Sequence, residues 1–297
     1  MAITQFGPAA KYQSGKGHRD ENFPVASLLL APGKRKPVLA FYRFARVADD
    51  VADHATLTPA EKLTLLDRME AALDGVEARE PEALALQEIL TERGLSDDHA
   101  RQLLSAFRQD ATTRRYQSWL ELLDYCAWSA MPVGRFVLDV HGEPRTTHAA
   151  SDAICAALQI INHLQDCGRD YRALDRVYIP LDMLERNGSG VDDLAMNEAS
   201  DGLRRTITAL CDRTDELLEA GEALPQQLRD RCLAREVEVI IALARNNVAR
   251  LRIEDPLQGG GRTSKPRTLS IALATLLRSL SRPCPSLQKG PAHDAGA

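Results

Sequence analysis

Aromatic residues make up only 5% of this 297-residue chain, and no segment alternates convincingly between apolar and polar residues as a strand would. Strands favour aromatic and β-branched residues, whereas alanine and leucine, which abound here, favour helices. The chain also lacks any run near the roughly 20 apolar residues that a membrane-spanning helix needs. These absences favour an all-helical protein that is soluble or peripheral to a membrane.

Other absences narrow the function. The six cysteines show no Cys-x-x-Cys spacing and no signal peptide is evident, so we expect reduced, buried thiols in a cytoplasmic protein. A net charge of −5 implies no basic face, which argues against general nucleic-acid binding. The chain contains no evident Ser–His–Asp or Cys–His nucleophile set and no dinucleotide-binding fingerprint.

Capping residues, glycine and proline divide the chain into expected helices. Thr58-Pro59-Ala60-Glu61 is a capping box with proline at the first helical position. We expect order from about Glu21, with Pro24 in a first helical turn, and helices over residues 37–54, 58–75, 118–141, 147–171, 199–220, 226–250 and 268–281, with Gly94 ending one more and Ser96 opening another. The expected organisation is a flexible N-terminus over residues 1–19, one helical domain over 20–282 and a disordered tail over 283–297.

Three segments carry specific expectations. Met131-Pro132-Val133-Gly134 should kink its helix, because proline removes a helical hydrogen bond and glycine a side chain. Such a kink can be mere packing, or it can open room for an elongated ligand. Residues 173–191 are expected to form an irregular connection that could act as a flap. The amphipathic helix over 268–281 fits either packing on the bundle or contact with a membrane surface.

The chain contains two Asp-x-x-x-Asp pairs, which we call the first acidic pair, Asp49 and Asp53, and the second acidic pair, Asp166 and Asp170. Residues four apart share a helix face, so each pair is a ladder of carboxylate oxygens. Mg²⁺ prefers such oxygens and completes its shell with water and phosphate. A single pair would more often be a solvated acidic face. The second pair favours a site for two or three Mg²⁺ ions and a diphosphate.

Further polar groups share these helix faces: Tyr42 and Arg46 lie with the first acidic pair, and Gln159 and Asn162 with the second. Arg46 can pair with a neighbouring aspartate, or it can grip phosphate oxygens bidentately. Arginines at the end of the second helix either complement its dipole or lie near the carboxylates. Two acid-bearing helices facing each other across a bundle would complete a metal–diphosphate site.

Two segments resemble the two motifs of the head-to-head prenyl synthases, the family of squalene, phytoene and dehydrosqualene synthases. They are FYRFARVADDVAD and QIINHLQDCGRD, and the second is followed by RVYIP. The resemblance runs from about residue 20 to residue 280. It implies an all-α isoprenoid-synthase bundle, one domain with a central cavity. The implied metal ligands are Asp49, Asp53, Asp166 and Asp170, which with Tyr42 are the implied catalytic residues. The implied contacts to substrate come from Arg46, Gln159, Asn162, Tyr125, Tyr178 and Arg267.

Two features resemble one subgroup, the bacterial hydroxysqualene synthases of the hopanoid route to squalene. ENFPVAS (residues 21–27) replaces a Ser-rich entry to the first helix, and Gln165 stands where many family members have arginine. This resemblance implies conversion of presqualene diphosphate and water to hydroxysqualene and diphosphate, with Mg²⁺ and without NADPH. It also implies hand-over from a presqualene diphosphate synthase and to a hydroxysqualene reductase, with contact to the membrane surface for a poorly soluble substrate.

Three alternatives stay open on the sequence. The chain could be another head-to-head prenyl transferase: a presqualene diphosphate, squalene or phytoene synthase. It could be a catalytically dead relative that acts as a scaffold, although both acidic pairs are intact. It could also be a hydrolytic helical metalloenzyme without prenyl specificity, against which the apolar segment around Pro132 argues.

Overall fold

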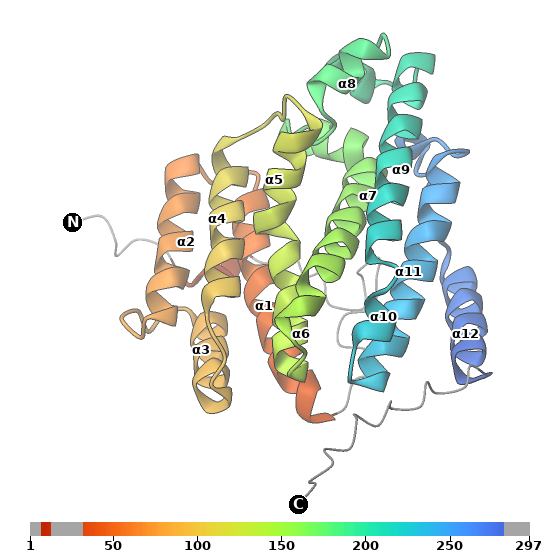
Figure 1. The fold of residues 1–297 in the computed structure, drawn as a ribbon. Coiled ribbons are helices and arrows are strands. Elements are labelled where there is room, and N and C mark those ends of the chain that lie inside the picture. The colour runs from red at the N-terminus through yellow and green to blue at the C-terminus, as the bar shows by residue number, and fades with distance from the viewer. Residues whose placement is uncertain (1–6, 13–31, 282–297) are drawn as a thin grey trace, which may run out of the picture.

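The structure is a computed structural model that describes residues 7–12 and 32–281. Long helices stand side by side in one bundle (Figure 1). Within the described residues, the β-type pairing consists of one isolated bridge between Arg115 and Val177. The all-α fold expected from the composition is therefore confirmed. The expected helical turn at Pro24 and the expected tail over 283–297 lie outside the described residues.

The described α-helices are α1 (Pro32–Asp53), α2 (Pro59–Leu73), α3 (Pro81–Arg93), α4 (Asp98–Thr112), α5 (Trp119–Ser129), α6 (Met131–His141), α7 (His148–Leu174), α8 (Leu181–Arg186), α9 (Asp201–Gly221), α10 (Leu224–Gln227), α11 (Arg231–Leu251) and α12 (Lys265–Ser281). Short 3₁₀ turns are η1 (Ala9–Tyr12), η2 (Arg145–Thr147), η3 (Val191–Ala195) and η4 (Pro256–Gln258). None of the described helices has the length and apolarity to cross a bilayer.

Local signals placed several helix ends correctly. Thr58 and Glu61 form the expected capping box at the start of α2: the Thr58 hydroxyl accepts from the Glu61 amide, and the Glu61 carboxylate accepts from the Thr58 amide at 2.7 Å. Gly94 ends α3 in the left-handed conformation, with φ of 63°. The start of α1 was placed too late, because Pro37 lies inside the helix, where it removes only one hydrogen bond near the N-terminus.

The expected kink around Pro132 is a complete break between α5 and α6. Ala130 at the break has φ of −123° and ψ of −45°, and Pro132 sits in the first turn of α6, where it needs no amide hydrogen. Close packing explains why residue 134 is a glycine, since a Cβ there would lie 2.4 Å from Ser151 Oγ and 2.5 Å from Cys155 Sγ. The absence of a side chain therefore lets α6 approach α7 closely.

The connection after α7 is more ordered than expected. It contains α8 and η3, and the Val177 amide donates to the Arg114 carbonyl at 2.9 Å while the Leu181 amide donates to the Tyr116 carbonyl at 3.0 Å. Val177, Tyr178 and Ile179 are buried. The first part of the segment is thus held against the loop between α4 and α5, and the connection is less irregular than expected.

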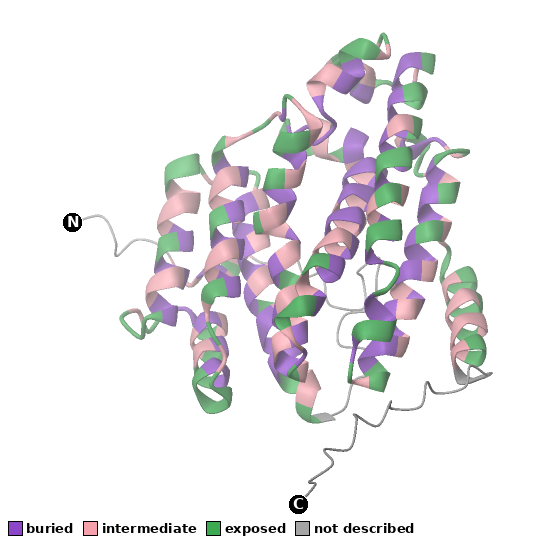
Figure 2. Cartoon of the chain, in the orientation of Figure 1, coloured by how far each residue is buried: buried purple, intermediate pink, exposed green. Residues whose placement is uncertain are grey.

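The helices α1 and α7 are the centre of the bundle, and buried residues concentrate along them (Figure 2). Phe44 and Val51 of α1, and Ile160, Ile161 and Leu164 of α7, are at most 1% exposed. Because these apolar side chains occupy the inner faces, the polar residues between them are left for another face of each helix. This division positions the site.

Candidate active site

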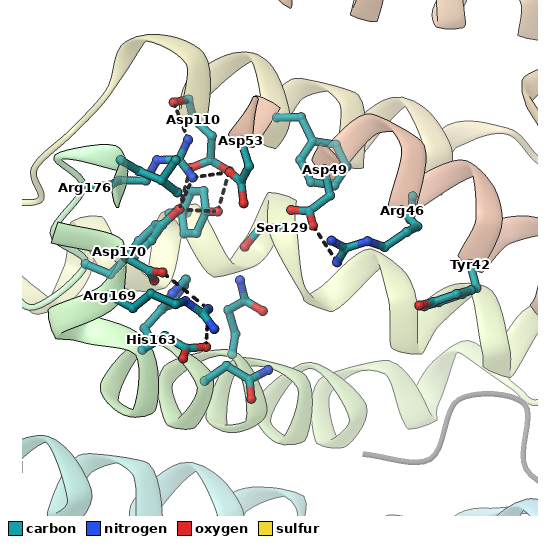
Figure 3. Close-up of a pocket in the computed structure, with 18 of the residues that line it drawn as sticks. Tyr42, Arg46, Asp49, Asp53, Asp110, Ser129, His163, Arg169, Asp170 and Arg176 are labelled. Atoms are coloured by element: carbon teal, nitrogen blue, oxygen red, sulfur yellow. Dashed lines mark hydrogen bonds and ion pairs between the residues drawn. The ribbon is translucent and has the colours of Figure 1, made fainter. Parts of the chain in front are cut away.

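The two acidic pairs line one cavity of about 730 Å³, which we call the polar chamber. The first pair comes from α1 and the second from α7, so residues more than a hundred positions apart meet there (Figure 3). Ten of the candidates from the sequence line this chamber: Tyr42, Arg46, Asp49, Asp53, Tyr125, Gln159, Asn162, Asp166, Asp170 and Tyr178. Arg267 is the one candidate that does not line it.

Arg46 pairs with both aspartates that lie three and four residues after it on α1. Its Nη1 lies 2.9 Å from Asp49 Oδ2, and its Nη2 lies 2.6 Å from Asp50 Oδ1. Asp50 is buried, whereas Arg46 and Asp49 border the chamber. Asp50 therefore anchors the guanidinium, and Asp49 marks the side of it that is turned toward the chamber.

The second acidic pair is also matched by arginines. Arg169 Nη2 lies 2.7 Å from Asp166 Oδ2 and 3.5 Å from Asp170 Oδ1. Arg262 reaches the other oxygen of Asp166 from the loop between η4 and α12. Asp166 thus stands between two cations, one from its own helix and one from a distant segment.

Arg262 takes the place in the chamber that the sequence suggested for Arg267. Arg267 is exposed on α12 and donates to Asn246 Oδ1 at 3.0 Å. The loop before it is fixed by Gln165, whose Nε2 donates to the Gly261 carbonyl at 2.7 Å. Gly261 has φ of 82°, and a Cβ there would lie 2.4 Å from Leu251 Cδ2. This tether directs Arg262, the next residue, to Asp166. A positive charge from the loop therefore lies close to Gln165, whose own side chain is uncharged.

Asp110 is a chamber residue that the sequence analysis missed. It lies in the last turn of α4, buried, and accepts hydrogen bonds at 2.8 Å from the hydroxyls of both Tyr125 and Tyr178. Burial raises its pKa to about 6, against the pull of the Arg176 guanidinium 3.9 Å away. The sequence does contain one indication of this position: its spacing from Leu103 and Ala106 puts the Asp110 carboxylate on the buried face of α4.

Arg176 connects this buried group to the first acidic pair. Its Nη1 lies 2.7 Å from Asp53 Oδ1 and donates to the Tyr178 hydroxyl at 3.2 Å. In the sequence, Arg176 is only one of several arginines near the end of α7. Its partner Asp53 is 123 positions away in the sequence, so local spacing could not reveal the pair.

Aromatic rings form one wall of the polar chamber. The His163 ring is stacked on Tyr178, with 3.6 Å between centroids, and Tyr125 lies 5.9 Å from His163. Burial lowers the pKa of His163 to about 3, so its imidazole is neutral at physiological pH. Burial raises the pKa values of Tyr125 and Tyr178 well above 10, so both phenols keep their protons.

The acidic pairs fit a divalent cation that is shared with a ligand. Burial, and then the charge of the other member of the pair, raise the pKa of Asp49 well above its usual value and that of Asp170 to about 7. Carboxylates held this close favour a bound cation. Among the described residues, no three potential ligands converge on one metal ion. Mg²⁺ usually takes few protein ligands and completes its shell with water and a ligand's oxygens, so the acidic pairs fit that cation.

A second cavity of about 290 Å³, the apolar chamber, adjoins the first. Tyr42 and Ala45 of α1 line both chambers, so the two meet there. Aliphatic and aromatic side chains from α1, α6, α7 and α11 dominate its wall, among them Val133 and Phe136. The site can therefore hold a ligand with a charged end and a long apolar part.

Comparisons with known proteins agree with this arrangement. A model of the family described as squalene/phytoene synthase matches residues 17–268. The hydroxysqualene synthase of Rhodopseudomonas palustris is 51% identical over 84% of this chain and 85% of its own, and that of Zymomonas mobilis is 45% identical over 89% and 90%. A crystal structure of a squalene synthase from Alicyclobacillus acidocaldarius superposes with a TM-score of 0.68 at 29% identity, covering 92% of this chain and 93% of that one.

Proposed function

The chain belongs to the squalene/phytoene synthase family, and on that premise we propose that it is a hydroxysqualene synthase. It converts presqualene diphosphate and water into hydroxysqualene and diphosphate. The observation that carries this proposal is the joining of the two chambers at Tyr42 and Ala45, one lined by both acidic pairs and the other apolar. The relatives that share 45–51% of their residues with this chain support the choice within the family.

Asp49, Asp53, Asp166 and Asp170 are the residues that would hold two or three Mg²⁺ ions. When bound, Mg²⁺ supplies neutralisation of the negative charge that develops on the departing diphosphate. The carboxylates come from two helices whose other faces are fixed in the core, so their separation is set before any ligand binds. This preorganisation lets the site act without rearranging its backbone.

Four arginines complement the acids of the polar chamber. They are Arg46, Arg169, Arg176 and Arg262, and each contacts at least one chamber aspartate. A guanidinium that pairs with carboxylate oxygens can pair in the same bidentate manner with phosphate oxygens. With Mg²⁺ held by the aspartates, these arginines would be able to pair with the diphosphate instead. Their positive charge then holds the leaving group after its bond to carbon breaks.

The apolar chamber receives the prenyl chains of the substrate. With the diphosphate in the polar chamber, the carbon that bears it lies near Tyr42 and Ala45, where the chambers meet. Heterolysis of the carbon–oxygen bond leaves a carbocation in a site with one wall formed partly by aromatic rings. The faces of Tyr125 and Tyr178 attract positive charge, and Asp110 fixes both hydroxyls. Rearrangement and capture by water complete the reaction, which makes the enzyme a carbon–oxygen lyase acting on a prenyl diphosphate. NADPH has no part in it.

The test is one incubation of the purified protein with Mg²⁺ and presqualene diphosphate, without NADPH, followed by mass spectrometry of the lipids. Hydroxysqualene is the expected product, and chelation of Mg²⁺ should abolish it. A protein that leaves presqualene diphosphate untouched, but forms it from farnesyl diphosphate, would instead be the preceding enzyme of the route. Phytoene from geranylgeranyl diphosphate would assign it to the phytoene synthases.

A poorly soluble substrate makes contact with the membrane surface useful to a cytoplasmic enzyme, as does hand-over from the preceding enzyme and to a following reductase. α12 packs on α11 but leaves Leu269, Leu273 and Leu277 between 57% and 71% exposed. These leucines lie four residues apart, on one face of the helix. Deleting residues 265–297 should weaken binding to liposomes of mixed zwitterionic and anionic lipids. Unchanged binding would remove α12 from this role.

A further inference from the structure

Ser129 is a chamber residue to which neither the motifs nor the ion pairs assign a role. It is the last residue of α5, and its side chain borders the polar chamber. Its Oγ is buried and has no hydrogen-bond partner within the described residues. Buried hydroxyls nearly always have a partner, so an isolated one in a cavity points to a ligand or a water molecule. In the view of Figure 3, Ser129 lies in the middle of the chamber, between Asp53 and His163.

The position of Ser129 in the chain places it between the two chambers' linings. The helix breaks at Ala130, and Val133 and Gly134, one turn further on, line the apolar chamber. Ser129 therefore lies between the acidic pairs and the wall that α6 gives to the apolar chamber. A substrate with its diphosphate in one chamber and its chains in the other must pass along this part of the site.

The packing of α5 and α6 on α7 supplies a second polar group opposite Ser129. Tyr125 faces His163, and Gly134 faces Cys155, so the two segments run antiparallel. Ser129 lies between these two contacts and is therefore opposite Gln159, which also lines the polar chamber. A water molecule needs two or more polar partners to be held in a cavity, and a hydroxyl with an amide meets this need.

We propose that the Ser129 hydroxyl positions the water molecule that captures the carbocation, and this inference rests on the proposed function. The water oxygen forms a bond to the cationic carbon and one of its O–H bonds breaks. The proton passes to the diphosphate released earlier in the same turnover. Ser129 accepts a hydrogen bond from the water and changes neither its bonds nor its charge. It is a positioning residue that decides between addition of water and loss of a proton from the cation.

Among the described chamber residues, His163 is the other uncharged one with a buried, unpartnered polar atom, its Nε2. Its ring is stacked on Tyr178 and lies opposite Tyr125, one helical turn further from the apolar chamber than Ser129. A water molecule held there would be more distant from the apolar chamber. The geometry therefore favours Ser129.

The experiment compares Ser129→Ala, Ser129→Thr and His163→Phe with the wild type, using presqualene diphosphate and Mg²⁺ in ¹⁸O-labelled water. Ser105→Ala is the matched control, because Ser105 is exposed on α4 and, in the part of the chain that the structure describes, its hydroxyl bonds only to the Arg101 carbonyl. Three quantities are measured: diphosphate release, the ratio of labelled alcohol to hydrocarbon formed by proton loss, and the thermal unfolding midpoint. The ratio reports the fate of the cation, which a purely structural role would not move.

Ser129→Ala should lower the ratio of alcohol to hydrocarbon about five- to tenfold, the effect of one lost hydrogen bond, while diphosphate release persists. Ser129→Thr, which retains a hydroxyl, should restore the ratio. An unchanged ratio in Ser129→Ala, or a fall in His163→Phe alone, would overturn the assignment and leave the proposed function standing. A wild type that forms no alcohol would overturn both.

Discussion

Replacing Gln165 with alanine tests whether a buried amide on α7 controls an arginine in the polar chamber. The Gln165 side chain is buried, and its Nε2 donates to the Gly261 carbonyl at 2.7 Å. The following residue, Arg262, pairs with Asp166. Without the amide, the loop that carries Arg262 loses the hydrogen bond from Gln165 to the Gly261 carbonyl, although no charge in the chamber is removed.

The expected loss of stability follows from the contact. Removing the donor and leaving a buried carbonyl unpaired costs about 1–3 kcal/mol. Removal of one buried methylene adds about 0.8 kcal/mol. The Gln165→Ala variant should therefore unfold about 2–4 kcal/mol more easily, toward the lower end if water reaches the Gly261 carbonyl. Urea unfolding measures this difference directly.

The loss of kcat/KM in Gln165→Ala should not exceed the loss caused by removing the Arg262 side chain itself. A hydrogen bond to a charged group contributes about 1.5–3 kcal/mol, so complete loss of the Arg262 contact should lower kcat/KM about 10- to 100-fold. Gln165→Ala should give part of this loss, because the arginine is still present but less well placed. Arg262→Ala should give all of it.

The double variant distinguishes a tether from an independent contribution. If Gln165 acts through Arg262, then Gln165→Ala should leave kcat/KM unchanged in a protein that already carries Arg262→Ala. Equal fold-losses in both backgrounds would refute the reasoning, because they would show that the amide contributes without the arginine. The loss of stability should persist in both backgrounds, and it serves as the internal control.

Three further predictions follow from the site. Asp49→Asn and Asp166→Asn should each lose most turnover in steady-state assays at saturating Mg²⁺ while the thermal unfolding midpoint stays near that of the wild type, because each removes a proposed metal ligand rather than core packing; near-normal rates would refute the ligand assignment. The pKa of Asp110 is about 6 in the folded protein against 3.8 in the unfolded chain, so its ionisation lowers stability as the pH rises through this window. The free energy of unfolding of the wild type should therefore rise by about 1 kcal/mol from this group when the pH is lowered from 7 to 5. Urea titrations at both pH values should show that Asp110→Asn lacks this gain. Gly134→Ala should destabilise the protein by about 1–3 kcal/mol, seen as a lower unfolding midpoint, because the added Cβ would meet Ser151 and Cys155 at 2.4–2.5 Å; an unchanged midpoint would show that α6 can move away from α7 at little cost.

The parts of the site that lie on single helices were predictable. Four-residue spacing puts Asp49 beside Asp53, and Asp166 beside Asp170, whatever the rest of the chain does, because a helix turns about 100° per residue. The same local geometry placed Arg46 next to Asp49 and Asp50. Pro132 likewise predicted an interruption of its helix, since a proline cannot donate a helical hydrogen bond.

Contacts between distant segments were not predictable in this way. Arg176 pairs with Asp53 across 123 positions, and Gln165 binds the Gly261 carbonyl across 96. Asp110 belongs to no motif, and it becomes part of the site because Tyr125 and Tyr178 arrive from two other elements. The choice of Arg262 over Arg267 depended on the path of a loop, which the tether and the left-handed Gly261 decide together.

The sequence by itself determined the helices, the two acidic pairs and the apolar faces behind them, because each depends on interactions within a few residues. Only the tertiary structure decided which arginines face the acids, that a buried aspartate holds two tyrosine hydroxyls, and that the polar and apolar chambers meet at Tyr42 and Ala45. These features depend on how α1, α4, α5 and α7 pack, and packing is fixed by the fit of whole helix faces to one another, which no short stretch of sequence contains.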